Sequence, residues 1–267
     1  MLFIVTETAA SLHYHRYLAL DEILGAQRPC SEEHDEMLFI VIHQAYELWF
    51  KELIHETRHV QAQLESGLGP GAQHTLRRIR AILKTLVSQL DILETLTPLQ
   101  YLTFRDQLER ASGFQSAQFR ELEALLGRRD RRVLVHYDEG SEARGRLVAA
   151  MSQPGVFDSF LRYLRDSGHP VPAPLLERDV AEPAEPSPEL QDLLIAVYRE
   201  DGEAAQLCES LVDLDEGLQE WRYRHVKMVE RTIGVKSGTG GSTGAAYLRA
   251  SLFNPVFPDL WEIRNRL

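Results

Sequence analysis

The sequence predicts an all-α protein, and three observations support this prediction. Apolar residues recur at three- and four-residue spacings through most of the 267 residues, which is the period of an amphipathic helix. Glycine and proline punctuate the chain between these periodic segments. Strand-like alternation is nearly absent, since the run VLVHY at 133–137 is the only candidate for a β-strand and it stands alone.

The helical period defines the predicted elements in chain order. They cover residues 32–66, 73–96, 98–110, 115–126, 155–166, 189–199 and 203–233. We expect the run SGLGPG to close the first of these helices, Pro98 to open a short one and Gly234 to end the last. Residues 169–188 are rich in proline and acidic residues, which predicts a surface excursion within a single domain formed by residues 1–267.

Composition restricts the classes of partner. The formal net charge of −11 disfavours nucleic acid or an anionic membrane as the main partner. Cys30 and Cys208 form no disulfide or metal-binding pattern, so we expect a protein of the reducing cytoplasm. The sequence contains neither a basic, apolar leader nor an apolar run long enough to cross a membrane.

One motif suggests a zinc protease, but its position on the helix argues against that interpretation. His55, Glu56 and His59 form H-E-x-x-H, which on a helix can bind zinc with two histidines and a glutamate base. A helical wheel places both histidines opposite the apolar face, towards solvent. The continuation also has Ala62 and Glu65 where one protease class needs glycine and histidine. A di-iron site built on E-x-x-H fails for the same reason, because its ligands must point into a bundle.

Two other histidines lie on apolar helix faces. His43 shares a face with Phe39 and Tyr46, and His225 follows Trp221 in a second apolar stripe. Such residues are either core histidines of a helical scaffold with satisfied hydrogen bonds, or ligands. A pair of them on two helices fits a haem between the helices, with one axial and one distal histidine. Without C-x-x-C-H, such a haem would be held non-covalently.

Two loops have distinctive compositions. The glycine-rich segment VKSGTGGSTG after Gly234 follows no predicted strand and matches neither G-x-G-x-x-G nor G-x-x-x-x-G-K, so nucleotide binding is disfavoured. Its backbone N–H groups and hydroxyls suit a lid over a small anionic ligand. The run RRDRR at 128–132 is expected to be a solvated loop.

Four blocks together resemble one family. FIVIHQAYELWFKELIHE, SGFQSAQFR, WRYRHVKMVERTIGVKSGTGGSTG and YHRYLALDEIL are similar to the tryptophan 2,3-dioxygenases, and the resemblance extends from about Tyr14 to the C-terminus. It implies a helical homotetramer with one b-type haem per subunit. The implied reaction uses O₂ to open the pyrrole ring of L-tryptophan between C2 and C3, which gives N-formylkynurenine, the first step of tryptophan catabolism by the kynurenine pathway.

The resemblance also implies the residues around the haem and the indole ring. His225 would be the axial ligand of the haem iron. His43 would lie in the distal pocket opposite the indole N–H, and Phe39 would pack on the indole ring beside the haem. Ser112 would line the haem pocket.

A further group is implied to hold the amino-acid part of tryptophan. Arg105 would grip the carboxylate next to Tyr101, and Thr239 would hold the ammonium and carboxylate groups. From the residues alone, Arg105 could equally form a surface salt bridge with Asp106 or Glu109. A haem sensor or carrier without oxygenase activity is the alternative, but it needs no carboxylate clamp. The residues implied to come from an adjacent subunit are Tyr14, Tyr17 and Leu18.

Overall fold

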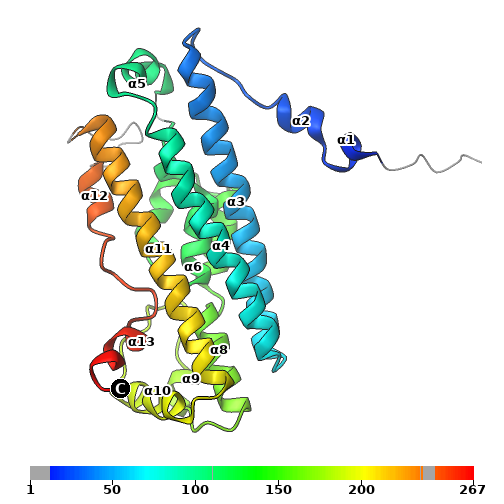
Figure 1. The fold of residues 1–267 in the computed structure, drawn as a ribbon, viewed down its shortest axis with the longest axis vertical. Coiled ribbons are helices and arrows are strands. Elements are labelled where there is room, and N and C mark those ends of the chain that lie inside the picture. The colour runs from blue at the N-terminus through cyan, green and yellow to red at the C-terminus, as the bar shows by residue number, and fades with distance from the viewer. Residues whose placement is uncertain (1–12, 110, 235, 237–243) are drawn as a thin grey trace, which may run out of the picture.

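Three long helices form the centre of the protein. The computed structural model describes residues 13–109, 111–234, 236 and 244–267. In Figure 1, α3 (His34–Glu65) runs down the molecule, and α4 (Gly69–Leu93) and α11 (Glu203–Ile233) run back up beside it. With 32 residues, α3 is about 48 Å long.

The apolar stripes found in the sequence are the surfaces on which these helices pack. On α3, Ile42, Tyr46 and Phe50 recur at helical spacing and are buried, and α11 buries Leu218 and Trp221 in the same way. α4 lies between α3 and α11 and packs against both. The hydroxyl of Tyr46 donates a hydrogen bond of 2.7 Å to the carbonyl of Leu86, which fixes α3 against α4.

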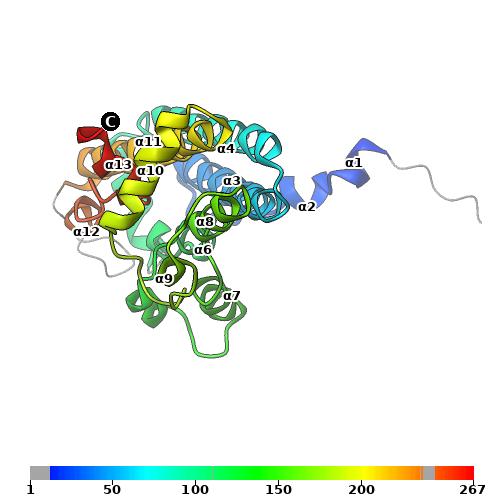
Figure 2. The same ribbon diagram turned by 90° about the horizontal axis from the view of Figure 1, so that it is seen from below.

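Shorter elements close the two ends and one side of this centre (Figures 1 and 2). Above it lies α5 (Pro98–Phe104), beside it α6 (Ala117–Leu125), α7 (Glu142–Met151) and α12 (Ala245–Arg249), and towards the lower end α8 (Val156–Asp166), α9 (Ala173–Leu176), α10 (Pro188–Glu200) and α13 (Pro258–Glu262). The 3₁₀ helices are η1 (Arg105–Leu108), η2 (Gly113–Gln115), η3 (Arg131–His136) and η4 (Ile263–Asn265).

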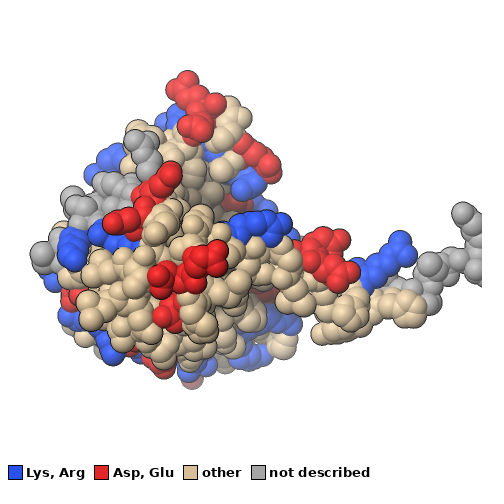
Figure 3. Space-filling model, turned by 90° about the horizontal axis from the view of Figure 1, so that it is seen from above, with Lys and Arg blue, Asp and Glu red and all other residues tan. Residues whose placement is uncertain are grey.

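An N-terminal arm, residues 13–29, extends away from the bundle. It contains α1 (Tyr14–Tyr17) and α2 (Leu20–Leu24) and projects from the body in all three views (Figures 1–3). Tyr14 and Tyr17 are 71% and 69% exposed. The arm therefore presents large aromatic side chains that the body of its own chain does not cover.

The all-helical prediction is confirmed for the residues that the structure describes, and the predicted segments match α3, α4, α6, α8, α10 and α11 closely. The strand candidate at 133–137 is wrong, because residues 133–136 of this run belong to η3 and Tyr137 directly follows it. Asp130 accepts a hydrogen bond from the backbone N–H of Arg132 at 3.1 Å and starts a tight helical turn there. The segment 98–110 is shorter than predicted, since Glu109 has a φ of 47° and ends the helical path.

Two further findings concern loops and membrane spans. Residues 169–188 are half-buried or exposed throughout and run over the surface between α8 and α10. SGLGPG closes α3, as predicted, but its second half already forms the first turn of α4. Among the described helices, none combines the length and apolarity that a membrane crossing requires.

Candidate functional site

A cavity of about 690 Å³ lies among the upper helices of the bundle. Its walls come from α3, the end of α4, α5, α6, α11, the segments around η2 and η3, and the C-terminal segment. Of the site residues predicted for the body of the chain, the cavity brings together all those that the structure describes, namely Phe39, His43, Tyr101, Arg105, Ser112 and His225. Residues that are up to 186 positions apart in the sequence, such as Phe39 and His225, therefore share one site.

The histidine of α3 is held in one tautomer by its own helix. Nδ1 of His43 lies 2.7 Å from the carbonyl oxygen of Phe39. A carbonyl can only accept, so Nδ1 carries the proton and Nε2 of the neutral ring is left as an acceptor. Burial lowers the pKa of His43, which favours this neutral form. The ring also packs on Phe39, with centroids 4.1 Å apart.

The histidine of α11 has the properties of a metal ligand. The ring of His225 stacks on Trp221, with centroids 5.1 Å apart and planes 15° apart. Burial lowers its pKa to about 4, and the nearby His43 and Arg120 act in the same direction. The imidazole is therefore neutral at pH 7. No protein group in the described part of the chain hydrogen-bonds to its ring nitrogens, so a nitrogen lone pair is available to a metal ion.

A cation lies in the wall near α5. Arg105 is the first residue of η1 and forms a hydrogen bond with the hydroxyl of Tyr101, one turn earlier. Burial raises the pKa of Tyr101, so its hydroxyl stays protonated at neutral pH. Phe104 between them is fully buried and fixes this turn against the core. Ser112 accepts the backbone N–H of Phe114 and shapes the adjoining turn η2.

The remaining predicted residues are placed differently. Tyr14, Tyr17 and Leu18 lie on or next to α1, in the N-terminal arm, and contribute nothing to the cavity of their own chain. Thr239 lies outside the described residues.

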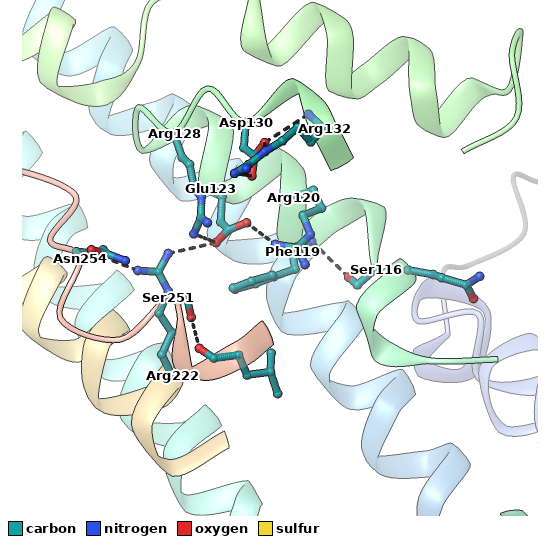
Figure 4. A network of polar contacts seen from close by, with 12 residues as sticks. Ser116, Phe119, Arg120, Glu123, Arg128, Asp130, Arg132, Arg222, Ser251 and Asn254 are labelled. Carbon is teal, nitrogen blue, oxygen red and sulfur yellow. Dashed lines mark hydrogen bonds and ion pairs between the residues drawn. The ribbon is translucent and has the colours of Figure 1, made fainter. Parts of the chain in front are cut away.

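The cavity wall also contains a charged group that the sequence pattern did not indicate. The carboxylate of Glu123 on α6 pairs with Arg120 at 2.7 Å and with Arg128 and Arg222 at 3.0 Å each (Figure 4). Its position could have indicated this, because Glu123 follows Phe119 by one helical turn and so falls on the apolar face of α6.

The expectation that RRDRR is a solvated loop was wrong in part. Arg129 is buried, and its guanidinium donates hydrogen bonds to the carbonyls of Val180 and Gln153 at 2.6 and 2.8 Å. Arg128 turns towards Glu123. The guanidinium groups of Arg128 and Arg129 therefore form hydrogen bonds with carbonyl and carboxylate oxygens of the protein instead of with water.

The H-E-x-x-H motif forms no metal site. His55 and His59 are exposed, as the helical wheel predicted. Glu56, by contrast, is buried and pairs with Arg78 of α4 at 2.7 Å. The described part of the chain contains no group of three or more histidine, cysteine or carboxylate side chains that could bind a metal ion.

Comparison with known proteins identifies the family. The sequence profile of the tryptophan 2,3-dioxygenases matches residues 5–147 and 189–267. The chain belongs to the tryptophan 2,3-dioxygenase family. It is 60% identical to the tryptophan 2,3-dioxygenase of Anaeromyxobacter sp. (strain K), with 97% of each chain covered. It is 52% identical to that of Herpetosiphon aurantiacus (96% of this chain and 99% of the relative) and 43% identical to that of Myxococcus xanthus (99% and 92%). The residues lining the cavity from Phe39 to Arg132 and from Trp221 onwards all lie inside the two matched ranges, and the surface excursion lies outside them.

Proposed function

We propose that this protein uses O₂ to open the pyrrole ring of L-tryptophan between C2 and C3 and releases N-formylkynurenine. One observation carries the proposal beyond family membership. A single cavity combines a neutral histidine whose ring nitrogens receive no hydrogen bond from the described residues, a histidine fixed as an acceptor, an aromatic wall and a guanidinium, supplied by His225, His43, Phe39 and Arg105. This set matches the iron ligand, the indole site and the carboxylate site that the reaction requires.

The cofactor we propose is b-type haem. The walls suit it, because Trp221 stacks on the neutral imidazole of His225, the proposed axial ligand, and the aromatic side chains of Phe50 and Phe119 line the same cavity. Ser112 lies in the same wall. When bound, the haem supplies the redox chemistry that activates O₂.

The protein's own part is to bind and orient tryptophan. The planar guanidinium of Arg105 can bind the carboxylate through two parallel hydrogen bonds, next to the protonated hydroxyl of Tyr101. Phe39 offers an aromatic face to the indole ring, and Nε2 of His43 can accept the indole N–H. Contacts at both ends of the substrate fix which ring bond faces the reactive oxygen.

The N-terminal arm supports a proposal about assembly. We propose a cytoplasmic homotetramer in which Tyr14, Tyr17 and Leu18 of one subunit close the site of a neighbour. The exposed aromatic rings of the arm are the reason, since they bury little surface within their own chain. Thr239 is proposed to hold the ammonium and carboxylate groups of tryptophan.

The test uses the purified, haem-loaded protein in its ferrous form. L-Tryptophan and ¹⁸O₂ are added, and N-formylkynurenine is followed by its ultraviolet absorbance and by mass spectrometry. The proposal expects product with both oxygen atoms labelled. A protein that shows an intact Soret band but forms no product would instead be a haem carrier or sensor.

A further inference from the structure

A buried carboxylate holds the N-terminal arm where it joins the body. We name residues 26–33, which connect α2 to the upper end of α3, the arm root (Figure 1). Glu36 lies in the first turn of α3 and is only 1% exposed. Its oxygens accept the backbone N–H groups of Cys30 and Ser31 at 2.7 Å each and the hydroxyl of Ser31 at 2.5 Å. Hydrogen bonds to an ionised acceptor are stronger than those between neutral groups, so this end of the arm root is firmly held.

A second contact holds the arm root farther down α3. The side-chain amide of Gln27 donates to the side-chain carbonyl of Gln44 at 2.7 Å, and the amide of Gln44 donates to the backbone carbonyl of Ala26 at 3.4 Å. Gln44 follows Glu36 by eight residues, which places the two anchors about 12 Å apart along the helix. The four residues from Gln27 to Ser31 span about 13 Å when extended, which matches this distance.

These two anchors determine where the arm points. A segment held at one point can rotate about it, whereas a segment held at two separate points is restricted to one direction. Within their own chain, α1 and α2 bury no residue. Apolar packing on the body therefore does not hold these helices, and the polar contacts of the arm root set the direction of the arm.

The anchors belong to the same turns of α3 that line the cavity. Phe39 and His43 lie between Glu36 and Gln44 in the sequence. The arm therefore leaves the body at a fixed position relative to the site of its own subunit. In a symmetric oligomer every subunit is placed alike, so this direction is also fixed relative to the site of a neighbour.

We propose that Glu36, together with Gln44, is a positioning residue for the substrate site of a neighbouring subunit, because it aims the arm so that Tyr17 reaches that site. This inference rests on the proposed assembly, in which the arm closes a neighbour's site. Glu36 is not among the residues that line the cavity of its own chain, so it acts through the arm. Without its hydrogen bonds a smaller fraction of arms is docked, and the apparent affinity for L-tryptophan falls by the same factor.

The experiment compares KM and kcat for L-tryptophan in haem-loaded variants. Glu36→Gln keeps the size of the side chain but replaces one accepting oxygen with a donor, so it should raise KM about tenfold and change kcat less than about twofold. Gln27→Ala removes the second anchor and should also raise KM, which provides a test if Glu36→Gln does not fold. Glu33→Gln is the matched control and should leave KM unchanged, because this exposed carboxylate at the start of the same helix caps no N–H group.

Mixed assemblies separate an effect on the neighbour from an effect on the same chain. Glu36→Gln is co-expressed with Arg105→Leu under two affinity tags, and only assemblies that carry both tags are assayed. In these, the intact site of a Glu36→Gln subunit can receive the unaltered arm of an Arg105→Leu subunit. Sites with the wild-type KM should therefore appear, as they should when Tyr17→Ala, in the arm itself, is paired with Arg105→Leu in the same way.

The outcomes distinguish the inference from the assembly on which it rests. A wild-type KM in Glu36→Gln, or in Gln27→Ala if the first variant does not fold, would overturn the inference. So would a raised KM that mixed assemblies fail to restore although they restore that of Tyr17→Ala, and in both cases the proposed assembly stands. If Tyr17→Ala has no effect or is not restored either, the proposed exchange of arms fails, and the inference fails with it.

Discussion

Arg105 provides the sharpest test of how the substrate is held. Arg105→Leu keeps the side chain close in volume but removes the guanidinium that hydrogen-bonds to Tyr101. The tryptophan carboxylate would then face an apolar side chain. Breaking a buried ionic contact from one side costs about 3–5 kcal/mol, so kcat/KM should fall by roughly two to four powers of ten.

The loss of kcat/KM expected for Arg105→Leu can be compared with the loss expected for a substitution of His43. His43→Ala removes one neutral hydrogen bond to the indole N–H, worth about 0.5–1.5 kcal/mol. It also removes the ring that packs on Phe39 at 4.1 Å, but this contact already exists in the free enzyme, so its loss lowers stability and not kcat/KM. The lost hydrogen bond corresponds to a decrease of roughly 2- to 13-fold in kcat/KM. Arg105→Leu should therefore be the more damaging change.

The assay is initial-rate formation of N-formylkynurenine by haem-loaded variants, with haem content measured on the same samples. Both variants should retain haem, and Arg162→Leu serves as a control that removes a guanidinium far from the cavity. A loss in His43→Ala that exceeds the loss in Arg105→Leu would refute the reasoning. His43 would then transfer a proton during the reaction, and positioning alone would not describe its role.

Further predictions concern other parts of the chain. His55→Ala with His59→Ala should leave haem content and turnover near wild type, since both imidazoles are exposed; a folded but inactive double variant would contradict this. His225→Ala should lose the normal Soret spectrum and most of the haem, as a spectrum after purification would show. Burial raises the pKa of Glu36, but hydrogen bonds from the segment at the root of the N-terminal arm outweigh it, and the net pKa is lowered. Its stabilising effect is therefore full above about pH 4.5 and lost as the pH falls, so Glu36→Gln should flatten the acid limb of a plot of Tm against pH. Asp215→Asn should lower the Tm measured by calorimetry, because the C-terminal segment would lose a buried charged acceptor.

The sequence predicted those helices whose stripes face the core over several turns. α3 and α11 bury apolar residues along most of their length, so the period is read from many residues and the bounds agree closely. α7 was not predicted, because its sequence EARGRLVAAM contains few large apolar residues and buries only Leu147, Ala150 and Met151. Short elements of this kind are determined by the surface they pack on, here α6, which the sequence alone does not display.

Predictions from the local sequence pattern were wrong in segments where a few polar contacts determine the path of the chain. VLVHY has the composition of a strand, but no second strand exists in the described residues to pair with it, and the turn at Asp130 starts η3. The sequence predicts that Arg129 is exposed to solvent, but its guanidinium donates hydrogen bonds to backbone carbonyls, including that of the distant residue Val180. Such partners come from elsewhere in the fold, so periodicity carries no information about them.

The histidines show why the site was easier to predict than its charged wall. An imidazole on an apolar stripe already conflicts with its surroundings, so His43 and His225 stood out within single helices. The burial of Glu123 and Arg222 becomes understandable only in the folded structure, where α6 and α11 lie together and the two side chains form an ion pair at 3.0 Å.

Helix α11 connects the proposed iron ligand to the C-terminal segment. Asp215 accepts the N–H groups of Val256 and Phe257 and the indole N–H of Trp261, the last at 2.9 Å. Two turns later Arg222 donates to the carbonyl of Asn254 at 3.4 Å while it pairs with Glu123, and His225 follows within the next turn. Because a helix is stiff along its axis, these contacts fix the position of α11 along its axis and its rotation about that axis. The His225 ring is thereby positioned relative to α6 and the C-terminal segment. The C-terminal residues thus act on the cavity in two ways, because they hold α11 in place and also line the cavity directly with Leu248, Ser251 and Asn254.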